Sequence, residues 1–239
     1  MSNGQIGGVG KSESMAPVQK AAYMSLRRDG ILDAALGLVD KHGLESLSMR
    51  KLATVLGVEA MSLYNHVPNK AALLDGLLER CMDEVETGEG DGLSWSERLR
   101  CSAWSVRRVA LRHPSFLPLL NSQEFHSEKV LRPVESALAA LREAGFDEDQ
   151  AIHAYQTLIG FVLGFSLQEG SGVIGLTCCN QSMRELGCEL SEVGLVPERF
   201  PFLISSLSSP AIATSDASFD FGLELILSGL QGMLRKSGE

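Results

Sequence analysis

The sequence has 239 residues, of which 44% are hydrophobic, and a formal net charge of −9 at pH 7. This length allows one large or two small domains with a buried core, and the negative charge excludes a protein that meets nucleic acid over its whole surface. Residues 1–80 are about neutral, with 9 Lys/Arg against 8 Asp/Glu, and the remainder carries 12 against 22, so only the N-terminal third is suited to contact DNA.

The five cysteines indicate neither a disulfide framework nor a zinc site, because their number is odd and no CxxC spacing occurs. We interpret them as reduced thiols; a redox sensor or soft-metal site at Cys178, Cys179 and Cys188 is the alternative. No other cofactor or metal site is indicated. No apolar run reaches 18 residues and no signal-peptide core is visible, so we expect a cytoplasmic protein without a membrane span.

Residues 1–24 are rich in glycine, serine and polar side chains without periodicity, which predicts a flexible arm. Gly7–Ser12 (GGVGKS) looks like the end of a phosphate-binding loop. The full pattern requires a glycine where Gln5 stands and a buried strand before it, so we do not expect nucleotide binding. A basic arm that contacts DNA phosphates through Lys11 or Lys20 is the alternative role.

A first helix is predicted over 25–42, where apolar residues recur at helical spacing until Gly43 ends the helix. This helix would brace a helix-turn-helix over about residues 48–67. The predicted N-cap of the second helix is Ser48, with Ser46 as the alternative. The apolar stripe of the second helix consists of Leu52, Val55 and Leu56.

Gly57 is expected to end the second helix, because glycine adopts a positive φ without steric cost. The chain restarts at Val58 in a helix too short to be stable alone, with Leu63 and Val67 predicted to point inward. Its outward face is small, polar and aromatic, which is typical of a recognition helix that enters a major groove. That face consists of Ala60, Met61, Ser62, Tyr64, Asn65 and His66.

Asn69 is the predicted N-cap of a fourth helix that runs to about Glu86. Lys70 lies in its first turn, where a phosphate would meet the backbone N–H groups and the ammonium together. A solvated lysine is the alternative. Glycines and acids over 88–92 predict a domain boundary. The predicted parts are therefore the arm over 1–24, a helix-turn-helix domain over 25–88 and a C-terminal domain over 93–239.

Beyond this boundary the pattern predicts helices and loops only. Ser94 and Glu97 form a predicted capping box, and Asp147 and Gln150 are predicted to cap a long apolar helix. The expected helices span 94–112, 127–144, 151–169, 197–207 and 219–235, with a mobile segment or short helix over 170–195.

Two of these helices, 151–169 and 219–235, are apolar around most of their circumference, and the first carries Gly160 and Gly164 four residues apart. Small residues at that spacing let another helix approach closely. Two such helices per chain therefore favour a four-helix homodimer interface. Burial of both helices inside the core of one chain is the alternative.

Two stretches resemble the DNA-binding domain of the tetracycline-repressor (TetR) family. Leu63–Asp75 reads LYNHVPNKAALLD, where the family commonly reads L-Y-x-H-V-x-N-K-x-x-L-L-D, and Gly43–Val58 reads GLESLSMRKLATVLGV. The likeness is strong over about residues 27–80. It is weaker in the stretches RHPS, AYQTLIGF and FDFGLELILSGL, which resemble the tetracycline-repressor-like C-terminal domain of one subgroup.

The resemblance implies an all-α homodimer with an N-terminal three-helix DNA-binding domain, which contains the helix-turn-helix, and a C-terminal helical ligand-binding and dimerisation domain. Its expected partners are double-stranded operator DNA and a small-molecule inducer. Matched positions that would contact DNA are Arg50, Ser62, Tyr64, His66 and Lys70, and the candidate set is completed by Ser48, Ala60, Met61 and Asn65. Tetracycline repressors have Gln, Pro and Trp where Ala60, Met61 and Asn65 stand, so we expect a different operator.

The resemblance does not carry over a ligand. Tetracycline repressors hold a magnesium chelate of the drug through histidine and acidic residues, and these have no confident match here. Aromatic residues and histidines of the C-terminal domain are candidates for an apolar pocket, although core filling, or a helix end for the histidines, explains them as well. The candidates are Trp104, His113, Phe116, Phe125, Tyr155 and Phe165, with Phe161 and His126 beside them.

The sequence therefore predicts a ligand-responsive, sequence-specific DNA-binding regulator, a repressor that a small-molecule inducer releases from its operator. An enzyme is not expected, because no Gly-x-Ser-x-Gly elbow, metal cluster or catalytic dyad is visible. The alternative is a helical interaction protein or small-molecule sensor whose N-terminal domain does not read DNA.

Overall fold

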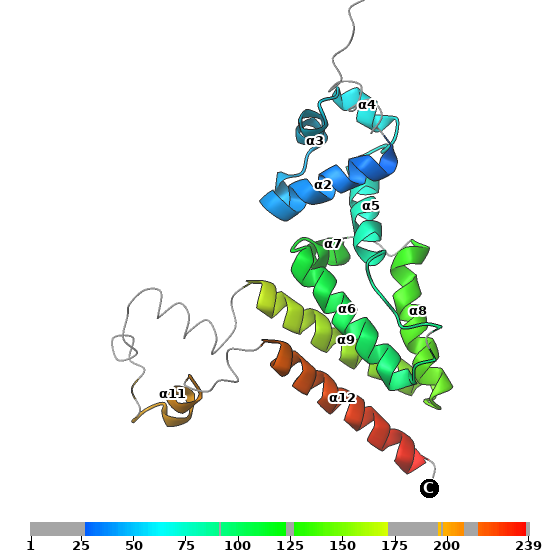
Figure 1. The fold of residues 1–239 in the computed structure, drawn as a ribbon, viewed down its shortest axis with the longest axis vertical. Helices are drawn as coiled ribbons and strands as arrows, with labels where there is room; N and C mark the ends of the chain where they lie inside the picture. The colour runs from blue at the N-terminus through cyan, green and yellow to red at the C-terminus, as the bar shows by residue number, and fades with distance from the viewer. Residues whose placement is uncertain are drawn as a thin grey trace, which may run out of the picture. The chain divides into compact units, whose positions relative to one another are not determined.

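The computed structural model describes residues 27–90, 92–122, 127–171, 196, 198–207 and 215–237. Every regular element in these ranges is a helix, which confirms the predicted all-α fold (Figure 1). The predictions for the arm over 1–24, for Phe125, His126 and for the three cysteines beyond position 177 concern residues outside these ranges. The chain divides into two compact units, residues 1–73 and residues 74–239.

The N-terminal unit is a small bundle of short helices. It contains α2 (Arg28–His42), η1 (Leu44–Ser46), α3 (Met49–Leu56), α4 (Ala60–Tyr64) and the start of α5 (Lys70–Met82). α2 packs on α3, and α3 packs on α4. Buried apolar side chains of the helices and of the turns between them form one core, which includes Ile31, Leu32, Ala35, Val39, Leu47, Leu52, Ala53, Leu63 and Val67.

Gly57 makes the turn between α3 and α4, as predicted. Its φ of 67° lies in the left-handed region, where a side chain would be strained. The N–H groups of Gly57 and Val58 donate to the carbonyls of Thr54 and Ala53, at 3.2 and 3.0 Å, and so satisfy the end of α3. Because α4 has only five residues, this turn and the buried Leu63 hold it in place.

Two predictions for this region are wrong. Val55 is exposed, because the inward stripe of α3 runs through Met49, Leu52 and Ala53, and Val55 lies to one side of it. α5 ends at Met82 and not near Glu86. The N–H groups of Glu84 and Val85 donate to the carbonyls of Cys81 and Met82, three residues back, at 3.2 and 3.1 Å, and the N–H of Glu86 donates to the hydroxyl of Ser105 at 2.9 Å. The division between the two compact units falls inside α5, and the domain boundary over 88–92 stays a prediction.

The C-terminal unit is built around α6 (Trp95–Arg112), which packs against α8 (Glu128–Glu143) and α9 (Glu148–Ser171). α12 (Ser215–Ser237) packs on α9, and α7 (Phe116–Ser122) follows the end of α6. α11 spans Pro201–Leu207, so it begins four residues later than predicted, whereas α12 begins four residues earlier. Taken over the described residues, no helix combines the length and hydrophobicity of a membrane span.

Both predicted caps of this unit are confirmed. Ser94 and Glu97 form a reciprocal capping box at the start of α6, with the N–H of Ser94 donating to the carboxylate of Glu97 at 2.8 Å. These hydrogen bonds hold the pKa of the Glu97 carboxyl below its usual value. Asp147 and Gln150 exchange side-chain to backbone hydrogen bonds of 2.8 and 3.2 Å at the start of α9.

Candidate functional site

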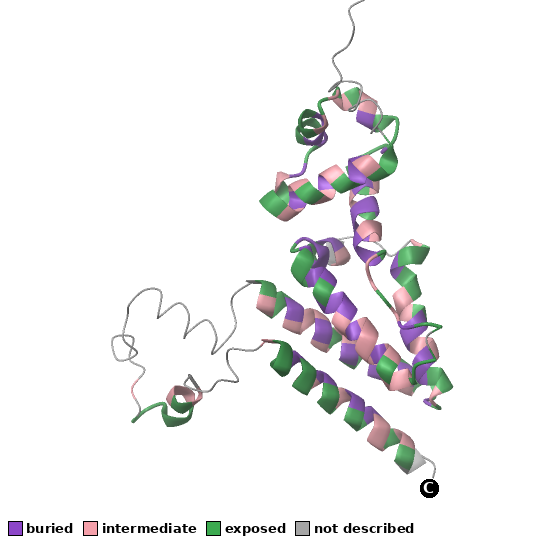
Figure 2. Ribbon diagram, in the orientation of Figure 1, coloured by how far each residue is buried: buried purple, intermediate pink, exposed green. Residues whose placement is uncertain are grey.

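The face of α4 that the sequence predicts to read DNA is open to solvent (Figure 2). Leu63 and Val67 are buried, as predicted, and they turn the remaining side chains of α4 outward. Met61 is 72% exposed and Tyr64 is 42% exposed, which are high values for side chains of this size. Asn65 and His66 are also exposed, and Ala60 and Ser62 are half-buried.

Cationic side chains accompany this face on the neighbouring helices. Arg50 lies on α3 and Lys70 begins α5, and both are exposed. Within the described part of the chain neither side chain takes part in a salt bridge, so both are available to phosphate oxygens. The side chain of Asn69 caps α5, since its carbonyl oxygen accepts the N–H of Ala72 at 2.8 Å.

Ser48 is the N-cap of α3, and its hydroxyl accepts the N–H of Lys51 at 3.2 Å. Ser46, the alternative that the sequence left open, instead donates its hydroxyl to the carbonyl of Gly43 at 2.8 Å. Because the cap fixes the first turn of α3, Ser48 orients the backbone at Arg50.

Replacing Ser48 by alanine is expected to cost the N-terminal unit about 1 kcal/mol of stability, because one N–H of α3 loses its acceptor. Amide hydrogen exchange should show this as roughly fivefold faster exchange at Lys51. Ser46→Ala removes a serine from the same surface and is the matched control. Equal exchange rates at Lys51 in the two variants would contradict the assignment of the cap.

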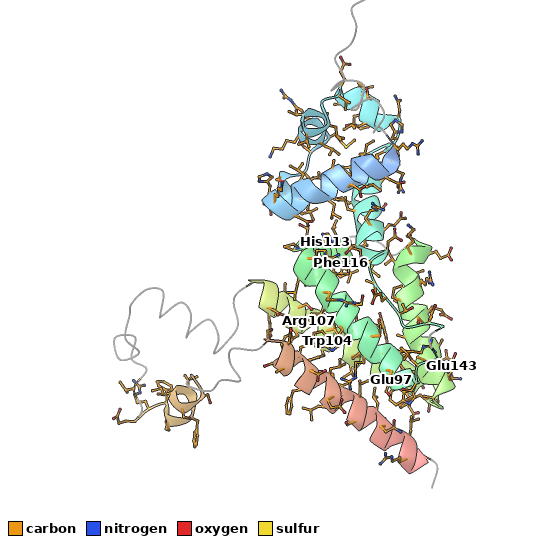
Figure 3. All side chains as sticks on the ribbon, viewed as in Figure 1. Glu97, Trp104, Arg107, His113, Phe116 and Glu143 are labelled. Carbon is orange, nitrogen blue, oxygen red and sulfur yellow. The ribbon has the colours of Figure 1, made fainter. Side chains whose placement is uncertain are left out.

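The candidate pocket residues of the C-terminal unit do not lie in one place, although Trp104 and Phe165 both contact Phe219. Trp104 and His113 are nine residues apart along α6, which is about 14 Å along the helix axis (Figure 3). Phe116 is buried in the core beyond that end of α6. Tyr155 and Phe165 are similarly separated along α9, and burial raises the pKa of the Tyr155 hydroxyl.

Trp104 and Phe165 belong to an aromatic cluster that the sequence did not predict as a unit. Phe219 of α12 is its centre, with ring centroids 4.9 Å from Trp104, 5.4 Å from Phe161 and 5.4 Å from Phe165. Gly222, one turn along α12, leaves room for Phe161, since a Cβ at this glycine would lie 2.5 Å from the ring. The cluster therefore joins α6, α9 and α12.

Arg107 lies inside this cluster and is a buried charged residue that the sequence did not predict. Its side chain is 3% exposed, and the guanidinium lies 4.9 Å from the ring centroids of both Trp104 and Phe219. It donates to both carboxylate oxygens of Glu169, at 2.7 and 2.8 Å, and to Asp216 at 2.7 Å. Burial alone would lower the pKa of Arg107, but these hydrogen bonds raise it, so the guanidinium stays charged.

His113 lies at the other end of α6 and is also buried. Its Nε2 lies 3.3 Å from a carboxylate oxygen of Glu84, whose second oxygen accepts a hydrogen bond from Arg112 at 2.6 Å. This histidine therefore faces a polar partner from the segment that follows α5, in agreement with the helix-end interpretation.

Known proteins match both units. The family model described as "Bacterial regulatory proteins, tetR family" matches residues 31–77, and "Tetracyclin repressor-like, C-terminal domain" matches residues 86–234. The chain is 31% identical to the HTH-type transcriptional repressor DrrR1 of Streptomyces coeruleorubidus over 90% of this chain and 81% of that protein.

Two solved structures illustrate what similar proteins bind. ActR of Streptomyces coelicolor in complex with actinorhodin is 30% identical, with a TM-score of 0.67 over 87% of this chain and 98% of that chain. BioQ, solved with its natural double-stranded DNA operator, is 26% identical, with a TM-score of 0.59 over 86% of this chain and 98% of that chain.

Proposed function

We propose a mode of action from one premise: the chain belongs to the TetR family and is therefore a DNA-binding transcriptional regulator, not an enzyme. In this proposal it represses transcription from an operator that it contacts through α4 and releases when a small molecule binds the C-terminal unit. The observation that carries the proposal is the exposed face of α4, with Met61 and Tyr64 turned outward by the buried Leu63 and Val67.

The proposed base contacts come from the outward face of α4, and the proposed phosphate contacts from the residues around it. Met61 and Ala60 present methyl groups that suit the methyl group of thymine, and Ser62 and Asn65 can hydrogen-bond to base edges. Tyr64, His66, Arg50 and Lys70 carry donors that suit phosphate oxygens. Ser48 contributes to DNA binding indirectly in this proposal, because it caps α3 and so orients Arg50.

We propose that the protein acts as a homodimer through α9 and α12. Exposed and buried residues alternate along both helices (Figure 2), and the exposed ones include large apolar side chains. Ile152 and Leu167 on α9 and Phe221 and Leu225 on α12 are exposed in the single chain. Gly160 and Gly164 have no side-chain atom near the position of a Cβ, so a second helix can approach the α9 backbone closely.

The effector is proposed to bind in the C-terminal unit, which contains the candidate aromatic and histidine side chains. The similar protein ActR, which was solved in complex with actinorhodin, supports a small-molecule effector for this chain. The candidate lining residues remain Trp104, His113, Phe116, Phe125, Tyr155 and Phe165. An aromatic lining of this kind suits a flat, largely apolar molecule.

Selection from random double-stranded DNA tests the proposal and identifies the operator sequence in the same experiment. Enriched sequences are expected to form an inverted repeat whose half-sites lie about one helical turn apart, because a two-fold symmetric dimer presents two copies of α4. Light scattering should give twice the 25.8 kDa of one chain. Absence of any enriched sequence from a folded dimer would favour the alternative, an interaction protein that does not read DNA.

A further inference from the structure

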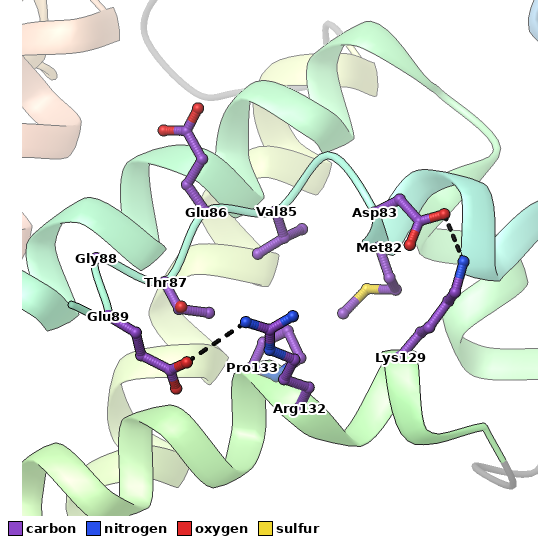
Figure 4. A pocket seen from close by; sticks show the side chains of 10 residues that line it. All are labelled: Met82, Asp83, Val85, Glu86, Thr87, Gly88, Glu89, Lys129, Arg132 and Pro133. Atoms are coloured by element: carbon purple, nitrogen blue, oxygen red, sulfur yellow. Dashed lines mark hydrogen bonds and ion pairs between the residues drawn. The ribbon is translucent and has the colours of Figure 1, made fainter.

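A pocket of about 330 Å³ lies between α8 and the segment that follows α5, residues 83–89 (Figure 4). Its volume is at the lower end of the range for small-molecule sites. None of the candidate effector residues that the structure describes lines it. The pocket is therefore a separate cavity of the C-terminal unit, and its own lining decides which ligand it can hold.

The middle of this pocket is apolar, and an ion pair bridges each of its ends (Figure 4). The apolar lining consists of Met82, Val85 and Pro133. At one end the carboxylate of Asp83 pairs with the ammonium of Lys129 at 2.7 Å. At the other end the carboxylate of Glu89 pairs with the guanidinium of Arg132 at 3.6 Å. Both cations come from α8, and in both pairs the acid is less exposed than the cation.

The pair between Glu89 and Arg132 is the weaker of the two. A separation of 3.6 Å exceeds the length of a good hydrogen bond. The side chain of Arg132 is also 70% exposed, so water and salt screen its attraction to Glu89. A ligand can therefore displace this guanidinium at little cost.

Glu89 is held in position by contacts other than Arg132. The hydroxyl of Ser136, a buried residue of α8, hydrogen-bonds to its carboxylate. This bond, together with the charges of Arg132 and Arg98, holds the pKa of the Glu89 carboxyl below its usual value, although burial acts in the opposite direction. The adjacent Gly88 is buried, and a Cβ there would lie 3.4 Å from the Cα of Arg98, so the backbone is packed directly on α6. The carboxylate is thus a fixed anion, and the guanidinium is a movable cover over it.

We propose that this pocket binds a small primary amine with an apolar body, whose ammonium takes the place of the Arg132 guanidinium at Glu89. The apolar body lies on the middle of the pocket, and the hydroxyl of Thr87 at the same end can accept a second N–H of the ammonium (Figure 4). No aromatic ring is present among the described residues of the lining, so a quaternary ammonium finds neither a hydrogen-bond acceptor that it can use nor a ring face. This site goes beyond the proposed function and does not depend on DNA binding.

The first test measures the binding of benzylamine, benzyltrimethylammonium and benzoate to the full-length protein by saturation-transfer NMR. Benzylamine is expected to bind with a Kd of about 1 mM, and the other two probes about tenfold more weakly. Tighter binding of benzoate than of benzylamine would overturn the proposed charge of the ligand. Equal binding of benzyltrimethylammonium would overturn the role of the ammonium N–H groups.

The second test places benzylamine in this pocket. Glu89→Gln keeps the shape of the side chain but removes its charge, and is expected to weaken binding about tenfold. Glu86→Gln is the matched control, because Glu86 points away from Glu89 and pairs with Arg108 on α6 (Figure 4), so binding should stay within about twofold. Arg132→Ala removes the competing cation and is expected to tighten binding about threefold, which the loss of a merely structural ion pair would not do. Unchanged binding to Glu89→Gln, or weaker binding to Arg132→Ala, would overturn the site.

Discussion

Replacing Tyr64 by alanine is expected to lower operator affinity about 100-fold, because the substitution removes a contact from both copies of α4 in the dimer. A single contact of this type contributes about 1–2 kcal/mol, and two equivalent losses add when the sites are far apart. The ring is 42% exposed and does not belong to the buried core of the N-terminal unit, so we expect its removal to leave that core folded. Fluorescence anisotropy with the selected DNA measures the effect.

Tyr64→Phe distinguishes the contribution of the hydroxyl to DNA affinity from that of the ring. It keeps the ring and removes only the hydroxyl, so we expect a smaller loss, about tenfold for the dimer, if the hydroxyl donates to a phosphate. The far-UV circular dichroism of both variants should match that of the unmodified protein. Undiminished affinity of Tyr64→Ala would place the DNA contact elsewhere and would remove the observation on which the proposed function depends.

Local signals allowed much of the fold to be predicted from sequence. Gly57 requires a positive φ, Ser94 with Glu97 forms a box of four residues, and Asp147 with Gln150 forms another, so each helix boundary is specified by neighbours in the chain. The segment after α5 is different, because the N–H of Glu86 donates to a hydroxyl on α6, which is distant in sequence. Tertiary bonds of this kind leave no local pattern.

The candidate site was predictable to unequal extents in the two units. The face of α4 follows from its helical spacing, since Leu63 and Val67 define the buried side and the rest must point outward. Arg107 was missed because an arginine in a helix is usually exposed, as its neighbour Arg108 is. A signal was present nonetheless: Arg107 lies four residues after Ala103 and three before Ala110, on the apolar face of α6.

The second large effect is expected on the free energy of unfolding when Arg107 is replaced. Arg107→Ala should lower the free energy of unfolding by about 3 kcal/mol, because it leaves Glu169, which is 20% exposed, without its bidentate partner and opens a gap among the aromatic rings. Urea unfolding followed by circular dichroism measures the loss, and one protein concentration for all variants keeps the contribution of dimer dissociation comparable.

Arg100→Ala is the matched control for this prediction. Arg100 also lies on α6 and also pairs with two acids, here Asp220 and Glu224, both on α12, but its side chain is 35% exposed. Arg100→Ala is expected to lower the free energy of unfolding by less than about 1 kcal/mol, since water can replace the guanidinium at this partly exposed site. Replacing both Arg107 and Glu169 by methionine should recover most of the stability, because no buried charge is then left unpaired. Equal costs for the two arginines would show that burial of the ion pair does not determine its contribution.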